Sequence, residues 1–197
     1  MKAADASVEP TASCRTADGH TRAARPMEIS VRREVPADWS HVEDVVRDAF
    51  GRAEEAQLVG RLRAFESVLS LVAHIHGTLV GHAMFSPVKE RRLETLSAGY
   101  ALAPVAVSRE WQRRGIGSRL IDFGLQELRR SGVGLVVVLG HASYYPRFGF
   151  VAAGPLGLRC KWGGEQGTFQ VLELAPGTAA EHRGLVDYHP IFEETAW

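Results

Sequence analysis

A short segment near the middle of the chain combines two glycines with basic residues at the start of a helical pattern. The segment is Gln112-Arg113-Arg114-Gly115-Ile116-Gly117-Ser118, and it follows the apolar stretch Val105-Ala106-Val107. A strand, a glycine-containing loop and a helix start direct several backbone N–H groups toward one point, where the helix dipole is also positive. Gly115 and Gly117 carry no Cβ, so an anion can approach the backbone closely. The segment therefore predicts a phosphate-binding loop, although a tight turn with a solvated basic face would use the same residues.

The positive charge around this loop is local. Arg109, Arg113, Arg114 and Arg119 stand against a single acid, Glu110. Over the whole chain of 197 residues, 23 Lys and Arg match 23 Asp and Glu. We therefore expect no nucleic-acid partner and no membrane partner, and no apolar run approaches the ~20 residues that span a bilayer.

A second segment, Tyr145-Pro146-Arg147-Phe148-Gly149-Phe150, follows about thirty residues later. The chain resembles the GNAT superfamily of acetyl-CoA-dependent N-acetyltransferases in two places. These are the Gln-x-x-Gly-x-Gly pattern with Val-Ala-Val before it, and this second segment. The pattern is closest to the small bacterial YhbS-like branch, in which an Ala-Pro-x-Ala-Val strand and a Leu-Gly…Tyr-Tyr-x-Arg-Phe-Gly-Phe segment are typical. The resemblance covers about residues 28 to 192.

The resemblance implies an α/β (α+β) fold, with a mixed, mostly antiparallel central sheet of about six to seven strands flanked by helices. In this family the sheet is splayed between its central strands, and acetyl-CoA is the co-substrate. Its pantetheine arm would pair with Val105, Ala106 and Val107 as though with another strand, and Gln112 would brace the loop. Backbone N–H groups would hold its pyrophosphate at Arg113, Arg114, Gly115, Ile116, Gly117 and Ser118. In relatives a bulge causes the splay; Pro104 suits one because it has no N–H, but the sequence does not locate the bulge.

The resemblance also implies a general acid. Tyr145 matches the family's tyrosine four residues before the glycine, and a phenol with a pKa of about 10 can protonate a thiolate whose conjugate acid titrates near ~8.5. Its neighbour Tyr144 is the weaker choice. The general base stays open, because the strand from Leu135 to Leu139 offers no carboxylate. Ordered water could suffice, and the candidate side chains are Glu66, His82, Tyr100, His141 and Glu173.

Composition suggests how the chain is divided. Residues 1–26 are rich in Ala, Thr, Ser and Arg and show no apolar period, so we expect a disordered extension before a single domain at 27–197. An apolar leader pattern is absent from this stretch. Cys14 and Cys160 have no metal or redox spacing, so we expect no metal site and reduced thiols in the cytoplasm. Homodimers are frequent in the family, and a small-molecule or peptide amine would be the acceptor.

Hydrophobic periodicity predicts the order of the elements. A first strand occupies 28–34, and two helices at 38–50 and 54–63 follow. A hairpin at 68–90 and a polar link at 91–99 lead to the central strand at 100–107. A helix at 117–130, a buried strand at 135–139, a short helix at 143–148 and late strands at 168–174 and 185–189 complete the chain.

Three functions compete on these observations. The first is an enzyme that transfers acetyl from acetyl-CoA to a primary amine by direct attack in a ternary complex. The second is a non-catalytic acyl-CoA-binding or regulatory module, which would keep the glycine loop without turnover. The third, nucleotide binding of the Rossmann type, is weak because neither a P-loop nor a full G-x-G-x-x-G is present.

Overall fold

The computed structural model describes residues 27–90, 99–163, 167–182 and 184–194. The predicted N-terminal extension at 1–26 and most of the predicted link at 91–99 lie outside these residues. Within these ranges, no helix is both long enough and apolar enough to cross a bilayer.

The described elements follow the predicted order. The longer helices are α1 (Trp39–Phe50), α2 (Glu54–Leu62) and α3 (Ile116–Arg130), and α4 (Thr178–Glu181) is a single turn. The strands are β1 (Ile29–Arg33), β2 (Leu69–Ile75), β3 (Thr78–Glu90), β4 (Gly99–Val107), β5 (Leu135–Leu139), β6 (Val151–Ala152), β7 (Leu158–Arg159), β8 (Phe169–Glu173) and β9 (Gly184–Asp187).

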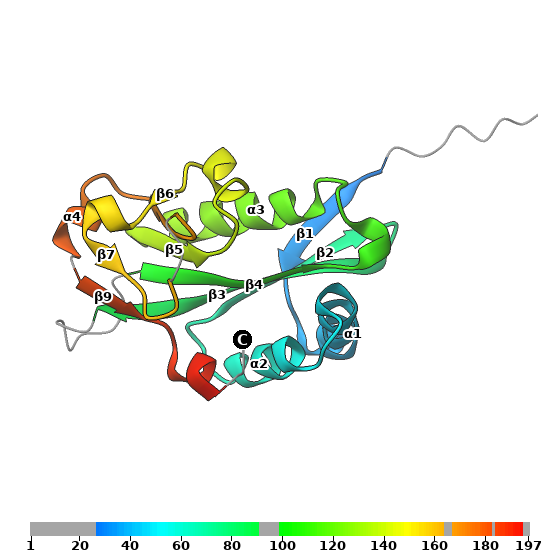
Figure 1. The fold of residues 1–197 in the computed structure, drawn as a ribbon. Helices are drawn as coiled ribbons and strands as arrows, with labels where there is room; N and C mark the ends of the chain where they lie inside the picture. The colour runs from blue at the N-terminus through cyan, green and yellow to red at the C-terminus, as the bar shows by residue number, and fades with distance from the viewer. Residues whose placement is uncertain (1–26, 91–98, 164–166, 183, 195–197) are drawn as a thin grey trace, which may run out of the picture.

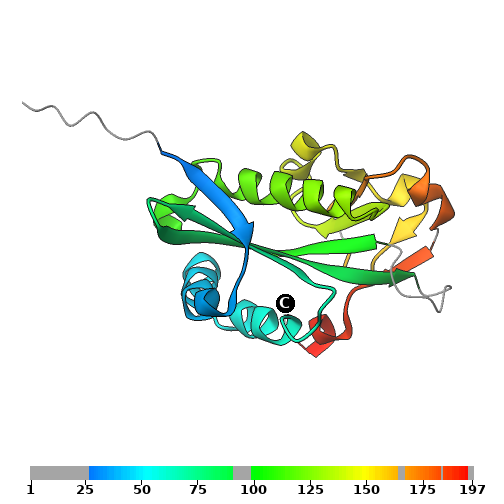
Figure 2. The same ribbon diagram turned by 180° about the vertical axis from the view of Figure 1, so that it is seen from behind.

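Seven of the strands follow one another in the central sheet in the order β1-β2-β3-β4-β5-β8-β6, and β9 pairs with both β3 and β7 off this path. Along this path β4 and β5 are parallel and every other neighbouring pair is antiparallel. Helix α3 covers one face, and α1 and α2 cover the other (Figures 1 and 2). The predicted mixed, mostly antiparallel sheet flanked by helices is therefore confirmed.

Each strand sends alternate side chains to the two faces, so the protein has two apolar clusters. On β3, Met84 and Val88 pack with α1 and α2, whereas Ala83 and Phe85 pack with α3. The apolar stripe of α3 is buried, with Ile116, Leu120, Ile121, Leu125 and Leu128 facing the sheet. Gly124 of this helix lies directly over Phe85, and a Cβ there would overlap the phenyl ring. The missing side chain therefore sets how closely α3 approaches the sheet.

We predict that Gly124→Ala destabilises the protein by about 1–3 kcal/mol, because Phe85 is fully buried and has no room to move away. Gly60→Ala in α2 is the matched control. A Cβ at Gly60 meets nothing within 4 Å, so this change should stabilise the protein by about 0.5–1 kcal/mol. Urea unfolding of both variants measures the difference, and equal stabilities would contradict this packing.

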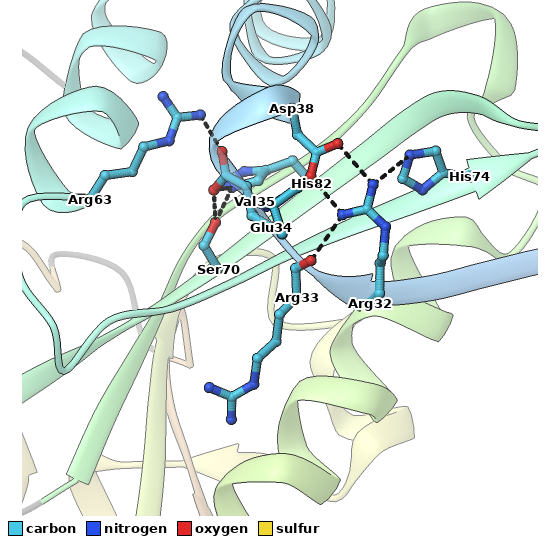
Figure 3. Close-up of polar contacts among 9 residues, drawn as sticks. All are labelled: Arg32, Arg33, Glu34, Val35, Asp38, Arg63, Ser70, His74 and His82. Carbon is cyan, nitrogen blue, oxygen red and sulfur yellow. Dashed lines mark hydrogen bonds and ion pairs between the residues drawn. The ribbon is translucent and has the colours of Figure 1, made fainter.

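A buried polar cluster ties the α1 and α2 layer to the sheet (Figure 3). We define it as Glu34, Arg63, Ser70 and His82. Arg63 Nη2 lies 2.5 Å from Glu34 Oε1, and the Ser70 hydroxyl donates to the other carboxylate oxygen, Oε2. His82 Nε2 lies 2.9 Å from Ser70 Oγ. Because that hydroxyl donates to Glu34, Nε2 must carry a proton, and this fixes the tautomer whenever the imidazole is neutral.

Burial controls the charge of this cluster. It lowers the pKa of His82 below 6.5, more strongly than Glu34 raises it, so the imidazole is neutral at pH 7. Burial alone would raise the pKa of Glu34, but the neighbouring His82, the Ser70 hydroxyl and the Arg63 guanidinium together outweigh it and lower the pKa. The cluster therefore holds one carboxylate and one guanidinium beneath the helices.

We predict that the free energy of unfolding falls as the pH drops below about 6.5. Between the lowered pKa of His82 and its ordinary value, the unfolded chain binds the extra proton and the folded chain does not.

His82→Gln keeps an N–H donor for Ser70 and removes the titrating group. Unfolding in urea at pH 7.5 and pH 5.5 should show a smaller loss for this variant. Part of the loss should remain, because the pKa values of His74 and His189 are also lowered by burial. Identical losses in the variant and the parent protein would contradict the prediction.

Candidate functional site

The central strands β4 and β5 are joined over a short length. Only Tyr100 with Val136 and Ala101 with Val137 are paired between them. The later part of β4, residues 102–107, has no partner on β5, while β5 continues along β8 on its other side. The predicted splay is therefore present, and it exposes one backbone edge of β4.

A bulge in β4 lies where the two strands separate. The β3 register passes from Ala83 opposite Val105 to Phe85 opposite Leu102. Met84 alone therefore faces two residues of β4, Ala103 and Pro104. The ladder is interrupted here because proline lacks an N–H. The peptide bond between Ala103 and Pro104 is cis. This places the bulge that the sequence could not locate, and Ala103 is half-buried beside the opening.

The glycine loop, Gln112–Ser118, joins the end of β4 to α3. Arg113 and Gly115 have left-handed φ values of 62° and 82°, and these turn the chain into the helix start. The Gln112 side-chain amide donates to the Val107 carbonyl at 3.0 Å, which braces the loop as expected. A Cβ at Gly81 would come within 3.0 Å of Ile116, so this glycine lets the helix start lie against β3.

A cavity of about 660 Å³ opens between this loop and the segment after β5. All predicted binding residues except Ala106 and Arg114 line it. Ala106 is buried toward α1 and α2, and the Arg114 guanidinium stacks over the Trp111 ring at 4.9 Å. The lining residues are Val105, Val107, Trp111, Gln112, Arg113, Gly115, Ile116, Gly117, Ser118, His141, Tyr144, Tyr145 and Arg147.

The arginines of the loop do not all serve this cavity. The backbone N–H of Arg109 donates to Asp48 of α1 at 2.7 Å. Its Nη2 lies 2.7 Å from the place where a Cβ on Gly51 would be, just past the end of α1. Of the four arginines in and beside the loop, Arg109, Arg113, Arg114 and Arg119, only Arg113 lines the cavity. The positive charge expected from sequence is thus partly directed to the C-terminal end of a helix, where cations are favoured.

Tyr144 lines the cavity, although the sequence had suggested only a minor place for it beside Tyr145. Its hydroxyl lies 3.3 Å from the position that a Cβ on Gly117 would occupy. Arg147 holds this tyrosine in place, since its guanidinium stacks over the ring at 4.5 Å and its Nε donates to the Tyr144 carbonyl at 2.9 Å. Tyr144 and Arg147 are three residues apart, and this spacing was the signal in the sequence that could have predicted their contact.

Tyr145 begins a short 3₁₀ helix, Tyr145–Phe148, where a slightly longer helix was expected. Gly140 follows β5, and a Cβ at this glycine would overlap the Tyr145 ring. The ring therefore lies across the end of β5, at the mouth of the opening, with Phe150 behind it at 5.7 Å between centroids. Burial, aided by Tyr144, raises the pKa of Tyr145 to about 12, so its phenol is neutral at pH 7.

Three of the candidate bases are engaged elsewhere. His82 is fully buried in the polar cluster and has no exposed surface for a substrate. Tyr100 donates its hydroxyl to the Ser67 carbonyl at 2.9 Å. Glu173 accepts a hydrogen bond of 2.7 Å from the Ala179 N–H in the first turn of α4. These side chains have structural partners.

The other two candidates differ in position. Glu66 is exposed on the loop between α2 and β2 and does not line the cavity. His141 is exposed and does line it, close to Tyr144 and Tyr145. The arrangement therefore brings together backbone donors, a free strand edge, two tyrosines and one histidine.

Comparison with known proteins gives this arrangement a context. Residues 39–150 match the acetyltransferase (GNAT) family. The Escherichia coli K12 protein described as uncharacterized N-acetyltransferase YhbS is 34% identical over 164 residues, which are 82% of this chain and 97% of YhbS. Uncharacterized N-acetyltransferase YjhQ of the same strain is 43% identical over 117 residues, 58% of this chain and 65% of YjhQ.

Two solved structures are similar in fold and sequence. E. coli YhbS in complex with CoA has a TM-score of 0.79 at 34% identity, covering 85% of this chain and 93% of that chain. A GNAT acetyltransferase from Brucella melitensis in complex with acetyl-CoA has a TM-score of 0.69 at 33% identity, covering 84% and 99%. The resemblance inferred from the sequence, including its YhbS-like character, is confirmed: the chain belongs to the GNAT family of acetyltransferases.

Proposed function

We propose that this protein transfers an acetyl group from acetyl-CoA to a primary amine, by direct attack of the amine in a ternary complex. The cavity carries the proposal, because it joins the glycine loop, the free edge of β4 and Tyr145 in one place. Two relatives at 34% and 33% identity were crystallised with CoA and acetyl-CoA, which supports the choice of co-substrate.

The residues present fit the diphosphate of CoA. A Cβ at Gly117 would lie 3.3 Å from the Tyr144 hydroxyl and 3.8 Å from Val107, so any side chain there would fill the space beside the helix start. Arg113 and the unpaired N–H groups of Gly115 to Ser118 would hold the diphosphate. The free edge of Val105–Val107 offers main-chain partners to the pantetheine amides, in the manner of an added strand.

Acetyl-CoA supplies an activated acyl thioester, and the protein must orient it and manage one proton. The interrupted ladder at Ala103 and Pro104 offers main-chain polar groups near the place where negative charge would develop. Tyr145 keeps its proton at neutral pH and lies at the mouth of the opening, which suits donation to a departing thiolate.

A covalent route through a cysteine is disfavoured. Cys160 is buried, 8% exposed, and burial raises the pKa of its thiol, so little thiolate is present at neutral pH. Direct attack by the amine needs no such nucleophile. The competing function, a module that binds acyl-CoA without turnover, would share the cavity but not the dependence on an amine.

We predict that Gly117→Glu lowers the affinity for CoA by at least about 100-fold, or ~2.7 kcal/mol, because the side chain fills and negatively charges the space beside the helix start. Isothermal titration calorimetry with CoA measures the change. Gly60→Glu is the matched control, since a side chain at Gly60 meets nothing within 4 Å. Unchanged affinity in the Gly117 variant would show that CoA binds elsewhere.

We predict that Tyr145→Phe reduces kcat by about 10²-fold or more and leaves CoA affinity nearly intact, since only the donated proton is lost. Release of free CoA thiol in the presence of an amine panel gives the rate. Wild-type turnover in this variant would remove Tyr145 from the mechanism. A parent protein that binds CoA and releases none with any amine would favour the module.

A further inference from the structure

One histidine of the cavity has no role in the reaction proposed above. His141 is the second residue after β5, and its exposed side chain lines the cavity together with Tyr144 and Tyr145. Its ring has no hydrogen bond or ion pair to any residue in the part of the chain that the structure describes. Among the five candidate bases, His141 alone lines this cavity. The imidazole therefore faces the cavity with both nitrogens open to a bound molecule.

The backbone that carries His141 is held on both sides. The Tyr144 N–H donates to the His141 carbonyl at 3.0 Å, and the side-chain amide of the buried Gln170 in β8 donates to the same oxygen at 3.4 Å. Just before it, the Gly140 N–H donates to the Thr168 carbonyl at 3.0 Å. A held backbone with an unbound ring lets the imidazole turn toward a substrate without breaking a hydrogen bond of the protein.

His141 and Tyr145 lie at the same end of the opening. A Cβ on Gly140, the residue before His141, would lie 2.4 Å from Cε2 of the Tyr145 ring. Val105 and Val107 line the cavity from β4, whereas His141 and Tyr145 line it from the segment after β5. A thioester whose pantetheine arm followed the edge of β4 would therefore stand between that edge and these two side chains.

The proposed reaction moves two protons at this place. The attacking nitrogen must lose one, and β5 presents no carboxylate to receive it. The departing sulfur must gain one, and Tyr145, whose pKa is raised to about 12, becomes a strongly basic phenolate when it supplies that proton. An imidazole accepts and releases protons near neutral pH, so one histidine can serve both needs.

We propose that His141 is the general base of the acetyl transfer and takes the proton of the attacking amine. The inference rests on the proposed function. As the N–C bond forms and the C–S bond breaks, a proton leaves the nitrogen for the His141 ring, and the Tyr145 proton moves to sulfur. The imidazolium then returns a proton to the Tyr145 oxygen, directly or through a water. One proton passes in total from nitrogen to sulfur, and both side chains regain their starting states.

The test removes the imidazole and then supplies it from solution. His141→Ala should lower kcat by about tenfold or more in the thiol-release assay, while the affinity for CoA in calorimetry stays unchanged. Added imidazole should restore part of the amine-dependent turnover, because it can enter the space of the lost ring. Thiol release is also measured without the amine, since imidazole can itself accept an acetyl group.

His41→Ala is the matched control, because His41 is also exposed but lies on α1 and does not line the cavity. This variant should keep its turnover, and imidazole should not raise it. Wild-type kcat in His141→Ala would overturn the base while the proposed function stands. A loss of CoA affinity, or a fall in kcat that imidazole does not reverse, would also overturn it, because His141 would then hold the cofactor or the loop. A parent protein that binds CoA but shows no amine-dependent release would overturn the proposed function and the base together.

Discussion

The separation of β4 from β5 is the constraint on which this structure depends. Two parallel strands in the middle of a sheet would ordinarily pair along their whole length, because unpaired buried backbone groups are costly. Here the pairing stops after Ala101, and the bulge at Ala103 and Pro104 follows at once. The remaining edge of β4 faces an opening, where its main-chain groups can meet water or another extended molecule.

Other features are arranged around this opening. The glycine loop begins where β4 ends, and Gly81 allows the start of α3 to lie against the sheet beside it. Tyr145 crosses the end of β5 because Gly140 has no side chain. On the other face, the buried pair of Glu34 and Arg63 helps to anchor the layer of α1 and α2. Backbone shape and missing side chains thus form the cavity as much as the polar side chains do.

Local patterns were sufficient for much of the fold and for the glycine loop. The apolar stripe of α3 repeats at helical spacing, and the start of the helix follows directly from two glycines, so both could be predicted. Contacts between distant segments could not. Sequence does not reveal that Arg109 turns toward α1, or that His82 is enclosed by Glu34 and Ser70, because each depends on which distant segments become neighbours. Pro104 suited an interrupted ladder, but the sequence did not locate the bulge, which is placed only by the register with Met84. The roles of the site residues, the N-terminal extension, the cytoplasmic location and a homodimer stay predictions.

The central claim is that main-chain N–H groups at the start of α3 bind the diphosphate of CoA beside the open edge of β4. Titration of ¹⁵N-labelled protein with CoA, followed by the backbone amide resonances, tests it most directly. The account predicts large, saturable shifts that develop together at Gly115, Ile116, Gly117 and Ser118. Saturable binding that leaves these four amides unperturbed, or no saturable shift at any residue, would contradict it.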